Sequence, residues 1–294
     1  LGLIDTKGEK NKYSYEFKDN VLKFSNEKLN FKCNFENGEF EFSDKSNNVL
    51  LSTVNGGANF SQTDVKYSGI RSFTTFKRSE NERFFGFGAR MYKLDRTGSS
   101  VDIFSEKGGT KSGDYGGFPG PYFISTKGFG LFFNNPWPHV YFDMAKTESD
   151  KWYINSPGGD YDIFVFAGGM SDIIKRYTAI TGRNKMPKKY LMGYWCSSLM
   201  FDEADAVLAD IEKMKEGGYP IDAIVIDGPW RGGKNFIKDY KAGWGYPSND
   251  YDWHPDFGDG KGMIKKLEED GIKTVLHINS CAFKPETAIP NIAK

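Results

Sequence analysis

The hydrophobic pattern of this chain changes its period near Met186 and Pro187. Before that point, short apolar segments alternate with polar residues and are separated by turn residues, a pattern typical of antiparallel β structure. After it, apolar strands alternate with amphipathic helices, the pattern of βα units with a parallel sheet. The change predicts two domains, a β domain at residues 1–186 and a parallel α/β domain at residues 187–294.

One hairpin is readable in the β half. Phe31, Cys33 and Phe35 alternate with polar residues, and the alternation resumes after a short break. Asn37 and Gly38 lie in the break, and this pair favours a tight hairpin turn because both residues tolerate positive φ. Similar short segments continue along the β half, so the sequence predicts an antiparallel β-sandwich.

The first helix is expected at the end of the β half, at residues 171–182. Ser171 is the candidate N-cap, because its hydroxyl can accept a hydrogen bond from the first turn. Gly182 is the candidate residue that ends the helix.

The second half predicts a parallel sheet whose strands are buried on both faces, because their apolar runs are nearly continuous. Only about 105 residues are available for it, whereas an eightfold βα barrel typically needs roughly 250. Three strands cannot close a barrel, and an open edge exposes unpaired backbone groups. We therefore expect a second chain or a cleaved continuation to complete the sheet. The expected strands are 190–197, 221–227 and 272–279, with helices at 202–218 and 260–271.

Composition excludes several classes of protein. Lys and Arg total 39, and Asp and Glu also total 39, which argues against nucleic acid or an anionic membrane as the main partner. No run of about 18 apolar residues exists, so no membrane span is expected. The three cysteines, Cys33, Cys196 and Cys281, are far apart and predict buried thiols, not a disulfide framework. With three histidines in the chain, no metal site and no cofactor are expected.

Residues 228–235, GPWRGGKN, resemble a phosphate-binding loop after a strand. Asn235 stands where a Mg²⁺-binding hydroxyl is needed, and Pro229 lacks a phosphate-facing N–H. We therefore reject nucleotide binding. Residues 251–260, which include His254 and three carboxylates, lack the spacing of a calcium loop and predict a solvated loop.

Polar and aromatic residues are placed at the expected strand ends. In parallel α/β folds, ligands bind at the carboxyl ends of the strands. An aspartate there can accept hydrogen bonds from two adjacent sugar hydroxyls, while aromatic rings cover the apolar face of a pyranose. A carbohydrate site is therefore one interpretation, and capping by the aspartate with packing of the tryptophans is the other. The candidate residues are Trp195, Asp227, Trp230, His277 and Asn279.

Several stretches, in one order along most of the chain, resemble glycoside hydrolase family 31, whose members include α-glucosidases, α-xylosidases, α-galactosidases and transglycosylases. The likeness is carried by the joint RYTAITGR-x-x-x-P, by the Pro-Ile-Asp strand that ends in Asp227, and by YDWHPDFGDGKGMIKKLEEDGIKTVLHIN. Upstream, ERFFGFGARMYKLDRTG and PYFISTKGFGLFFNN are similar to the family's β-sandwich.

The resemblance implies a β-sandwich followed by the first part of a (β/α)8 barrel, here its first three βα units. It also implies retaining hydrolysis of α-glycosides, with one aspartate as nucleophile and another as acid and base, about 5–5.5 Å apart. In the family both lie on later strands, so we expect them beyond Lys294 and assign neither role to a residue of this sequence.

Substrate-binding roles are implied at positions that match the family. Asp227 matches an aspartate that holds hydroxyls of the terminal sugar, and Trp230 matches a frequent aromatic after it. A loop of the sandwich, within residues 105–120, is expected to reach the pocket with Asp114 and Tyr115, although a flexible glycine-rich connection explains it equally well.

Two stretches depart from the family pattern, DGPW after the second strand and HINS after the third. Both lie where the terminal sugar is expected, which disfavours plain α-glucosidase activity and leaves α-galactosides or N-acetylgalactosaminides open. The main expectation is an exo-acting retaining α-glycosidase whose partner is an α-linked oligosaccharide or glycoconjugate. A non-catalytic carbohydrate-binding or scaffold relative, and a transglycosylase, remain alternatives. An extracellular or cell-surface bacterial location is slightly favoured over the cytoplasm.

Overall fold

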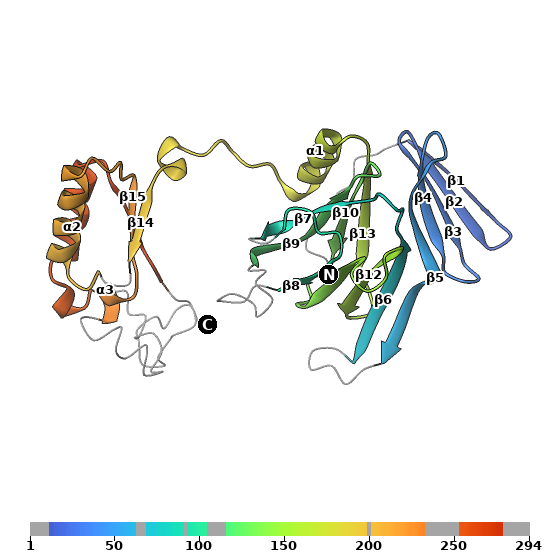
Figure 1. Cartoon of the computed structure of the whole chain (residues 1–294), viewed down its shortest axis with the longest axis horizontal. Helices are drawn as coiled ribbons and strands as arrows, with labels where there is room; N and C mark the ends of the chain where they lie inside the picture. The colour runs from blue at the N-terminus through green and yellow to red at the C-terminus, as the bar shows by residue number, and fades with distance from the viewer. Residues whose placement is uncertain are drawn as a thin grey trace. The chain divides into compact units, whose positions relative to one another are not determined.

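The computed structural model divides the chain into two units, Leu1–Asn184 and Lys185–Lys294 (Figure 1). The structure describes residues 12–62, 69–90, 93–104, 116–198, 201–232 and 253–278.

The first unit contains two antiparallel sheets. The larger sheet has nine strands in the order β1-β2-β3-β4-β5-β6-β12-β11-β8, and the smaller has four in the order β13-β10-β9-β7, counted over the described residues. The larger sheet comprises β1 Tyr13–Lys18, β2 Val21–Asn26, β3 Leu29–Asn34, β4 Phe40–Asp44, β5 Val49–Gln62, β6 Ile70–Lys77, β8 Ser99–Ile103, β11 Val140–Met144 and β12 Lys151–Pro157. The smaller comprises β7 Phe84–Arg90, β9 Gly116–Ser125, β10 Phe129–Asn134 and β13 Asp162–Ala167.

An aromatic core joins the two sheets. Trp152 on β12 stacks on Phe76 of β6, with ring centroids 4.1 Å apart. The same indole meets two rings of the smaller sheet edge-on, Phe123 at 5.3 Å and Phe84 at 5.8 Å. All four side chains are fully buried. These contacts confirm the predicted β-sandwich, because each sheet buries one face against the other.

The predicted hairpin is confirmed as β3–β4, but its turn is longer than expected. Cys33 pairs with Phe40, and the Asn34 N–H donates to the Glu39 carbonyl at 2.8 Å. Five residues, 35–39, therefore form the connection, and Gly38 adopts φ 71° within it. Phe35 lies in this turn and is exposed instead of alternating inward.

Helix α1, Met170–Thr181, covers the outer face of the smaller sheet. Ile173 is fully buried there against Ile124, Phe132 and Phe166. The prediction of Ser171 as N-cap is wrong. The cap is Gly169, whose carbonyl already accepts from the Ile173 N–H at 3.0 Å, so the helix begins before Ser171. Gly182 follows the last turn with φ 102°, as predicted.

The segment after α1 departs from the expected strand 190–197. Residues 182–188 have no regular structure, and Lys189–Met192 form the 3-10 helix η1. Strand β14 covers only Trp195–Ser198. The apolar run that suggested a longer strand therefore includes one helical turn.

The second unit contains three parallel strands in the order β14-β15-β16 (Figure 1). Two helices connect them, α2 after β14 and α5 after β15, so both helices predicted in this half are confirmed, as is the parallel sheet. The remaining elements are β15 Ala223–Ile226, β16 Lys273–Leu276, α2 Ala204–Glu216, α3 Pro229–Gly232, η2 Pro255–Phe257 and α5 Gly260–Glu269.

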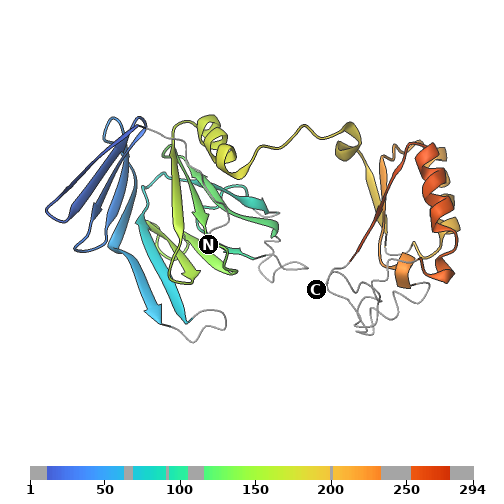
Figure 2. The same ribbon diagram turned by 180° about the vertical axis from the view of Figure 1, so that it is seen from behind.

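Helices α2 and α5 lie on the same face of this sheet (Figure 2). Val207 and Leu267 are fully buried there with Ile224 of β15. The expectation that the strands are buried on both faces is met by most of β15 but not by β16, where Lys273 and Val275 are exposed. In the described part of the chain, the helices cover one face only, so residues of β16 alternate between covered and exposed positions.

Candidate functional site

Asp227 lies directly after β15, at the carboxyl end of the parallel sheet. Its Oδ1 accepts a hydrogen bond from the Gly228 N–H at 2.7 Å and lies 2.8 Å from Nδ1 of His277. Oδ2 makes no hydrogen bond within the part of the chain that the structure describes, and 23% of the side chain is exposed. One oxygen of the carboxylate is thus held by the protein, and the other is available to accept hydrogen bonds from a ligand.

His277 lies directly after β16, one strand further along the sheet. The His277 N–H donates to the Ile226 carbonyl at 2.9 Å, so the parallel ladder continues one residue past the end of β16. Because Ile226 pairs with Leu276, the residues that follow them, Asp227 and His277, arrive side by side. The imidazole is 41% exposed. The structure therefore brings these two predicted site residues together at one strand edge.

Trp230 does not lie where a tryptophan that stacks on a sugar is expected. It lies in the single turn of α3 and is only 2% exposed. Its Nε1 donates to the carbonyl of His277 at 3.0 Å, and its ring packs edge-on against Trp253 at 5.3 Å. The Arg231 guanidinium lies 5.3 Å from the ring centroid. The side chain is buried and its N–H is bonded internally, so the expected stacking of Trp230 on a sugar is contradicted.

Trp195 lies at the other end of the sheet. It opens β14 in register with Ala223, the first residue of β15, and its Nε1 donates to the Tyr190 carbonyl at 2.9 Å. The expectation that Trp195 lies at a carboxyl strand end is wrong, because η1 occupies the residues that were expected to begin the strand. Its ring is therefore separated from Asp227 by the length of the strand.

Three further candidates, Asp114, Tyr115 and Asn279, fall outside the described residues. In the rejected phosphate-loop stretch, Pro229–Gly232 form one helical turn, and the residues after it lie outside the described part.

The described cysteines, Cys33 and Cys196, are free thiols, and burial raises the pKa of each above its ordinary value. Neither is therefore a thiolate nucleophile at neutral pH. Over the same described ranges, no three side chains of His, Cys, Asp or Glu are grouped so that they hold a metal ion.

The sequence did not predict the contact between Asp227 and His277, although it named both residues. The signal was present, since each residue directly follows a strand and the two strands are neighbours. The sequence did not give the register of the two strands, which places their carboxyl ends next to each other.

The architecture defines a class of protein, a β-sandwich joined to the first strands of a parallel βα barrel with a carboxylate at a strand's carboxyl end. Family models agree: residues 3–143 match the glycosyl hydrolase 31 N-terminal galactose mutarotase-like domain, and residues 184–293 match the family 31 TIM-barrel domain. The chain belongs to glycoside hydrolase family 31.

Two relatives similar to this chain are named α-xylosidases. An α-xylosidase of Saccharolobus solfataricus is 24% identical over 268 residues, which cover 88% of this chain and 33% of the relative. The α-xylosidase XylQ of Lactiplantibacillus pentosus is 26% identical over 204 residues, covering 68% of this chain and 25% of the relative. The chain thus spans a quarter to a third of the length of these two relatives.

Solved structures support the fold. The family 31 dextranase of Flavobacterium johnsoniae, complexed with isomaltotriose, superposes with a TM-score of 0.75 at 21% identity, covering 94% of this chain and 32% of the other. A family 31 α-xylosidase from a soil metagenome, complexed with xylose, superposes with a TM-score of 0.70 at 18% identity. The match covers 94% of this chain and 40% of the other. Across the described segments, no helix has the length and apolar character to cross a membrane.

Proposed function

We propose that this chain forms part of an exo-acting, retaining α-glycosidase and that Asp227 binds hydroxyls of the terminal α-linked sugar. The observation that carries the proposal is the half-engaged carboxylate of Asp227 at the carboxyl end of β15 in a family 31 chain. A carboxylate can accept hydrogen bonds from two neighbouring hydroxyls, and such charge-assisted bonds contribute about 1.5–3 kcal/mol each.

His277 has a supporting role in this proposal. Its Nδ1 donates to Oδ1 of Asp227, and its carbonyl is fixed by the buried Trp230 indole. The carboxylate therefore has one preferred orientation before the sugar arrives, which lowers the entropy lost on binding.

An α-xyloside is the first substrate to test. Relatives from S. solfataricus and L. pentosus are named α-xylosidases, while Gly228-Pro229 and the residues after β16 differ from the usual family pattern. α-Glucosides, α-galactosides and α-N-acetylgalactosaminides form the comparison set. In the proposal, the nucleophile and the acid/base are aspartates on barrel strands later than β16, and none of the described residues has either role.

The test is the variant Asp227→Asn, in a protein that contains this chain together with a complete barrel. The amide keeps the shape but loses the charge, and kcat/KM on aryl α-glycosides is expected to fall roughly 100-fold. Asp256→Asn, in the short helix η2, is the matched control and is expected to keep activity. Near-normal kcat/KM in Asp227→Asn would overturn the assigned role. Saccharide binding without turnover in the unsubstituted protein would instead identify a non-catalytic relative.

A further inference from the structure

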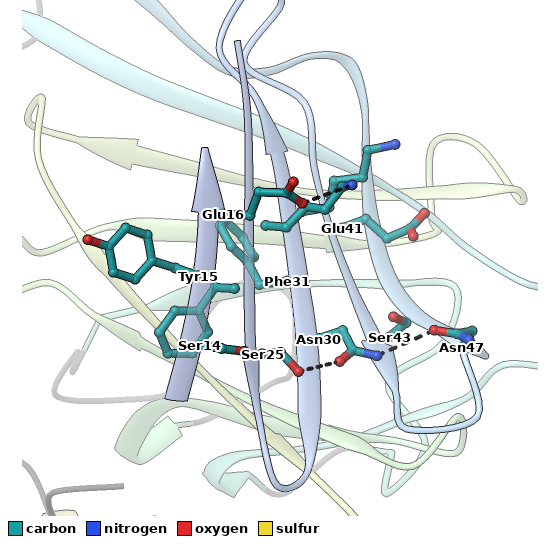
Figure 3. Close-up of a pocket in the computed structure, with 12 residues that line it drawn as sticks. Ser14, Tyr15, Glu16, Ser25, Asn30, Phe31, Glu41, Ser43 and Asn47 are labelled. Atoms are coloured by element: carbon teal, nitrogen blue, oxygen red, sulfur yellow. Dashed lines mark hydrogen bonds and ion pairs between the residues drawn. The ribbon is translucent and has the colours of Figure 1, made fainter. Parts of the chain in front are cut away.

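A groove of about 590 Å³ lies on the polar face of the meander β1–β4, and none of its lining residues belongs to the candidate site (Figure 3). All four strands contribute to its lining, together with Asn47 in the turn after β4. Its volume falls within the range of small-molecule sites, roughly 300–1,000 Å³. Two parallel rows of side chains, running across the strands, form its walls.

The first row consists of neutral hydroxyl and amide groups. Ser25 Oγ donates to Asn30 Oδ1 at 2.8 Å, and Asn30 Nδ2 lies 3.4 Å from Asn47 Oδ1 (Figure 3). Asn30 Nδ2 also donates to the Asp44 carbonyl at 3.0 Å. Lys45 Nζ lies 2.8 Å from both Ser25 Oγ and Asn30 Oδ1. These bonds orient the row before any ligand binds. The strand register places its four members opposite one another: Ser14, Ser25, Asn30 and Ser43.

The second row is charged but balanced. Lys23 Nζ lies 3.4 Å from Oε2 of Glu16. Lys32 and Glu41 are also paired by register, yet no ion pair joins these two described residues. Their charged ends remain available to a ligand, and the row carries no net charge. Its members, two lysines and two glutamates, are Glu16, Lys23, Lys32 and Glu41.

The floor between the rows is backbone. Side chains alternate between the faces of a strand, so Tyr15, Phe24 and Phe31 project to the opposite face. There Phe24 stacks on Tyr13 at 5.1 Å and Phe31 packs on Phe42 at 4.8 Å. The rows are two residues apart, about 7 Å, and four strands give the groove a length of about 14 Å. This shape suits a narrow chain, not a globular ligand.

The chemistry of the lining selects a neutral, polyhydroxylated ligand. Serine, asparagine, lysine and glutamate provide both donors and acceptors, which match sugar hydroxyls. The methylene stems of Lys23 and Lys32 provide apolar contacts for sugar C–H groups. Within the charged row, an anionic ligand meets Glu16 and Glu41, and a cation meets the two lysines. Lys45 adds one positive charge beside the neutral row, where its ammonium is already held by Ser25 and Asn30, so an anion is the comparison ligand that the test must include.

We propose that this groove is a second saccharide-binding site, which holds a short segment of a neutral oligosaccharide on the N-terminal sandwich. The choice of a saccharide rests in part on the proposed function. A site of this kind would keep a longer substrate near the protein and raise its effective concentration, without taking part in bond cleavage.

The test is an NMR titration of the full 15N-labelled chain with maltotriose and isomaltotriose, using inorganic phosphate as the anionic comparison. All measurements use the Asp227→Ala background, so that the candidate site is removed. The groove variant is Lys32→Ala/Glu41→Ala. Its matched control, Lys18→Ala/Glu36→Ala, makes the same charge changes at exposed residues outside the groove.

Saccharide-induced shifts are expected in the Asp227→Ala chain and in the control, with affinity at least tenfold weaker in the groove variant, since the hydrogen bonds from Lys32 and Glu41 are lost. Binding of equal strength in the groove variant would overturn the proposal, as would no binding of either trisaccharide in the Asp227→Ala chain. Stronger binding of phosphate than of saccharides would also overturn it. None of these results depends on the role of Asp227, and comparison of Tm values shows whether both double variants are folded.

Discussion

The imidazole Nδ1 of His277 lies 2.8 Å from Oδ1 of Asp227, across a sequence separation of 50 residues. The contact joins the ends of two neighbouring parallel strands, and Oδ2 of the aspartate makes no hydrogen bond with a described residue. A carboxylate held in this way is a prepared acceptor for sugar hydroxyls, so the orientation of Asp227 is expected to depend on His277.

His277→Ala is expected to lower kcat/KM on aryl α-glycosides roughly tenfold, because the carboxylate loses its oriented partner. His277→Asn, whose amide can donate from nearly the same place as Nδ1, is expected to recover part of the loss. His254→Ala is the matched control, since His254 faces Asp256 and not Asp227. Equal activity for the alanine and asparagine variants would contradict a role that depends on this hydrogen bond.

Trp230→Phe is expected to destabilise the second unit by about 1–3 kcal/mol, because the carbonyl of His277 loses its buried donor. Trp230→Ala is expected to cost about 3–5 kcal/mol, since it also leaves a cavity beside Trp253. Urea unfolding monitored by fluorescence gives both values. Trp195→Phe, at a partly exposed position, is the control and should change stability by less than about 1 kcal/mol. A similar loss for Trp195→Phe and Trp230→Phe would argue against a special structural role of Trp230.

Gly130→Ala is expected to destabilise the sandwich by about 1–3 kcal/mol through overpacking. A Cβ at Gly130 would lie 2.4 Å from Cγ2 of Ile173, so α1 would have to move away from β10. Thermal unfolding measures the change. Gly69→Ala is the control, because a Cβ there would meet no heavy atom within 4 Å. If both variants have the same Tm, helix α1 is not packed as closely as described.

Glu82 makes a pH-dependent contribution to stability. Burial raises the pKa of its carboxyl above the ordinary value, although Ser125 Oγ and the Ser79 N–H donate to it. The folded protein therefore holds this proton more tightly than the unfolded chain, and stability is lost as pH rises from the ordinary pKa through the raised one. The variant Glu82→Gln carries no such charge, so its stability relative to the unsubstituted chain should increase between pH 4 and pH 7.

Urea unfolding of both proteins at the two pH values tests this prediction, because the other carboxyls contribute equally and cancel in the difference. Asp44→Asn, compared with the unsubstituted chain at pH 5 and pH 2, is expected to give the opposite sign, with its relative stability increasing as pH falls. Hydrogen bonds from Asn48 lower the pKa of Asp44, so its contribution is present above the unfolded pKa and lost as pH falls through the folded one. If the stability of both variants, relative to the unsubstituted chain, changed with pH in the same direction, the pKa shifts assigned to Glu82 and Asp44 would be contradicted.

Sequence patterns predicted helices and strands correctly where residues close together in the chain determine the structure. The alternation around Asn37 and Gly38 predicted the β3–β4 hairpin, and the apolar spacing within residues 202–218 predicted α2. The predictions that were wrong concerned element ends. Ser171 is an acceptable cap by composition, but the preceding strand ends at Ala167 and lets the helix begin earlier.

The two tryptophans show where sequence reasoning stopped for the site. Trp195 and Trp230 both lie near predicted strand ends, and both carry a ring suited to sugar. The 3-10 turn η1 puts Trp195 at the start of its strand, while the one-turn helix α3 folds Trp230 inward onto Trp253. Neither outcome follows from spacing, because each depends on how a short irregular segment packs against residues distant in the chain.

The sequence by itself determined the class of this protein: a β half, then βα units, with an aspartate directly after the second parallel strand. Period and residue type carry that information, because each reflects burial along a single element. The tertiary structure alone decided that His277, not Trp230, lies beside Asp227, and that four strands of the sandwich align their polar residues into a groove. Both results come from register between strands, and register is fixed by packing across the whole sheet.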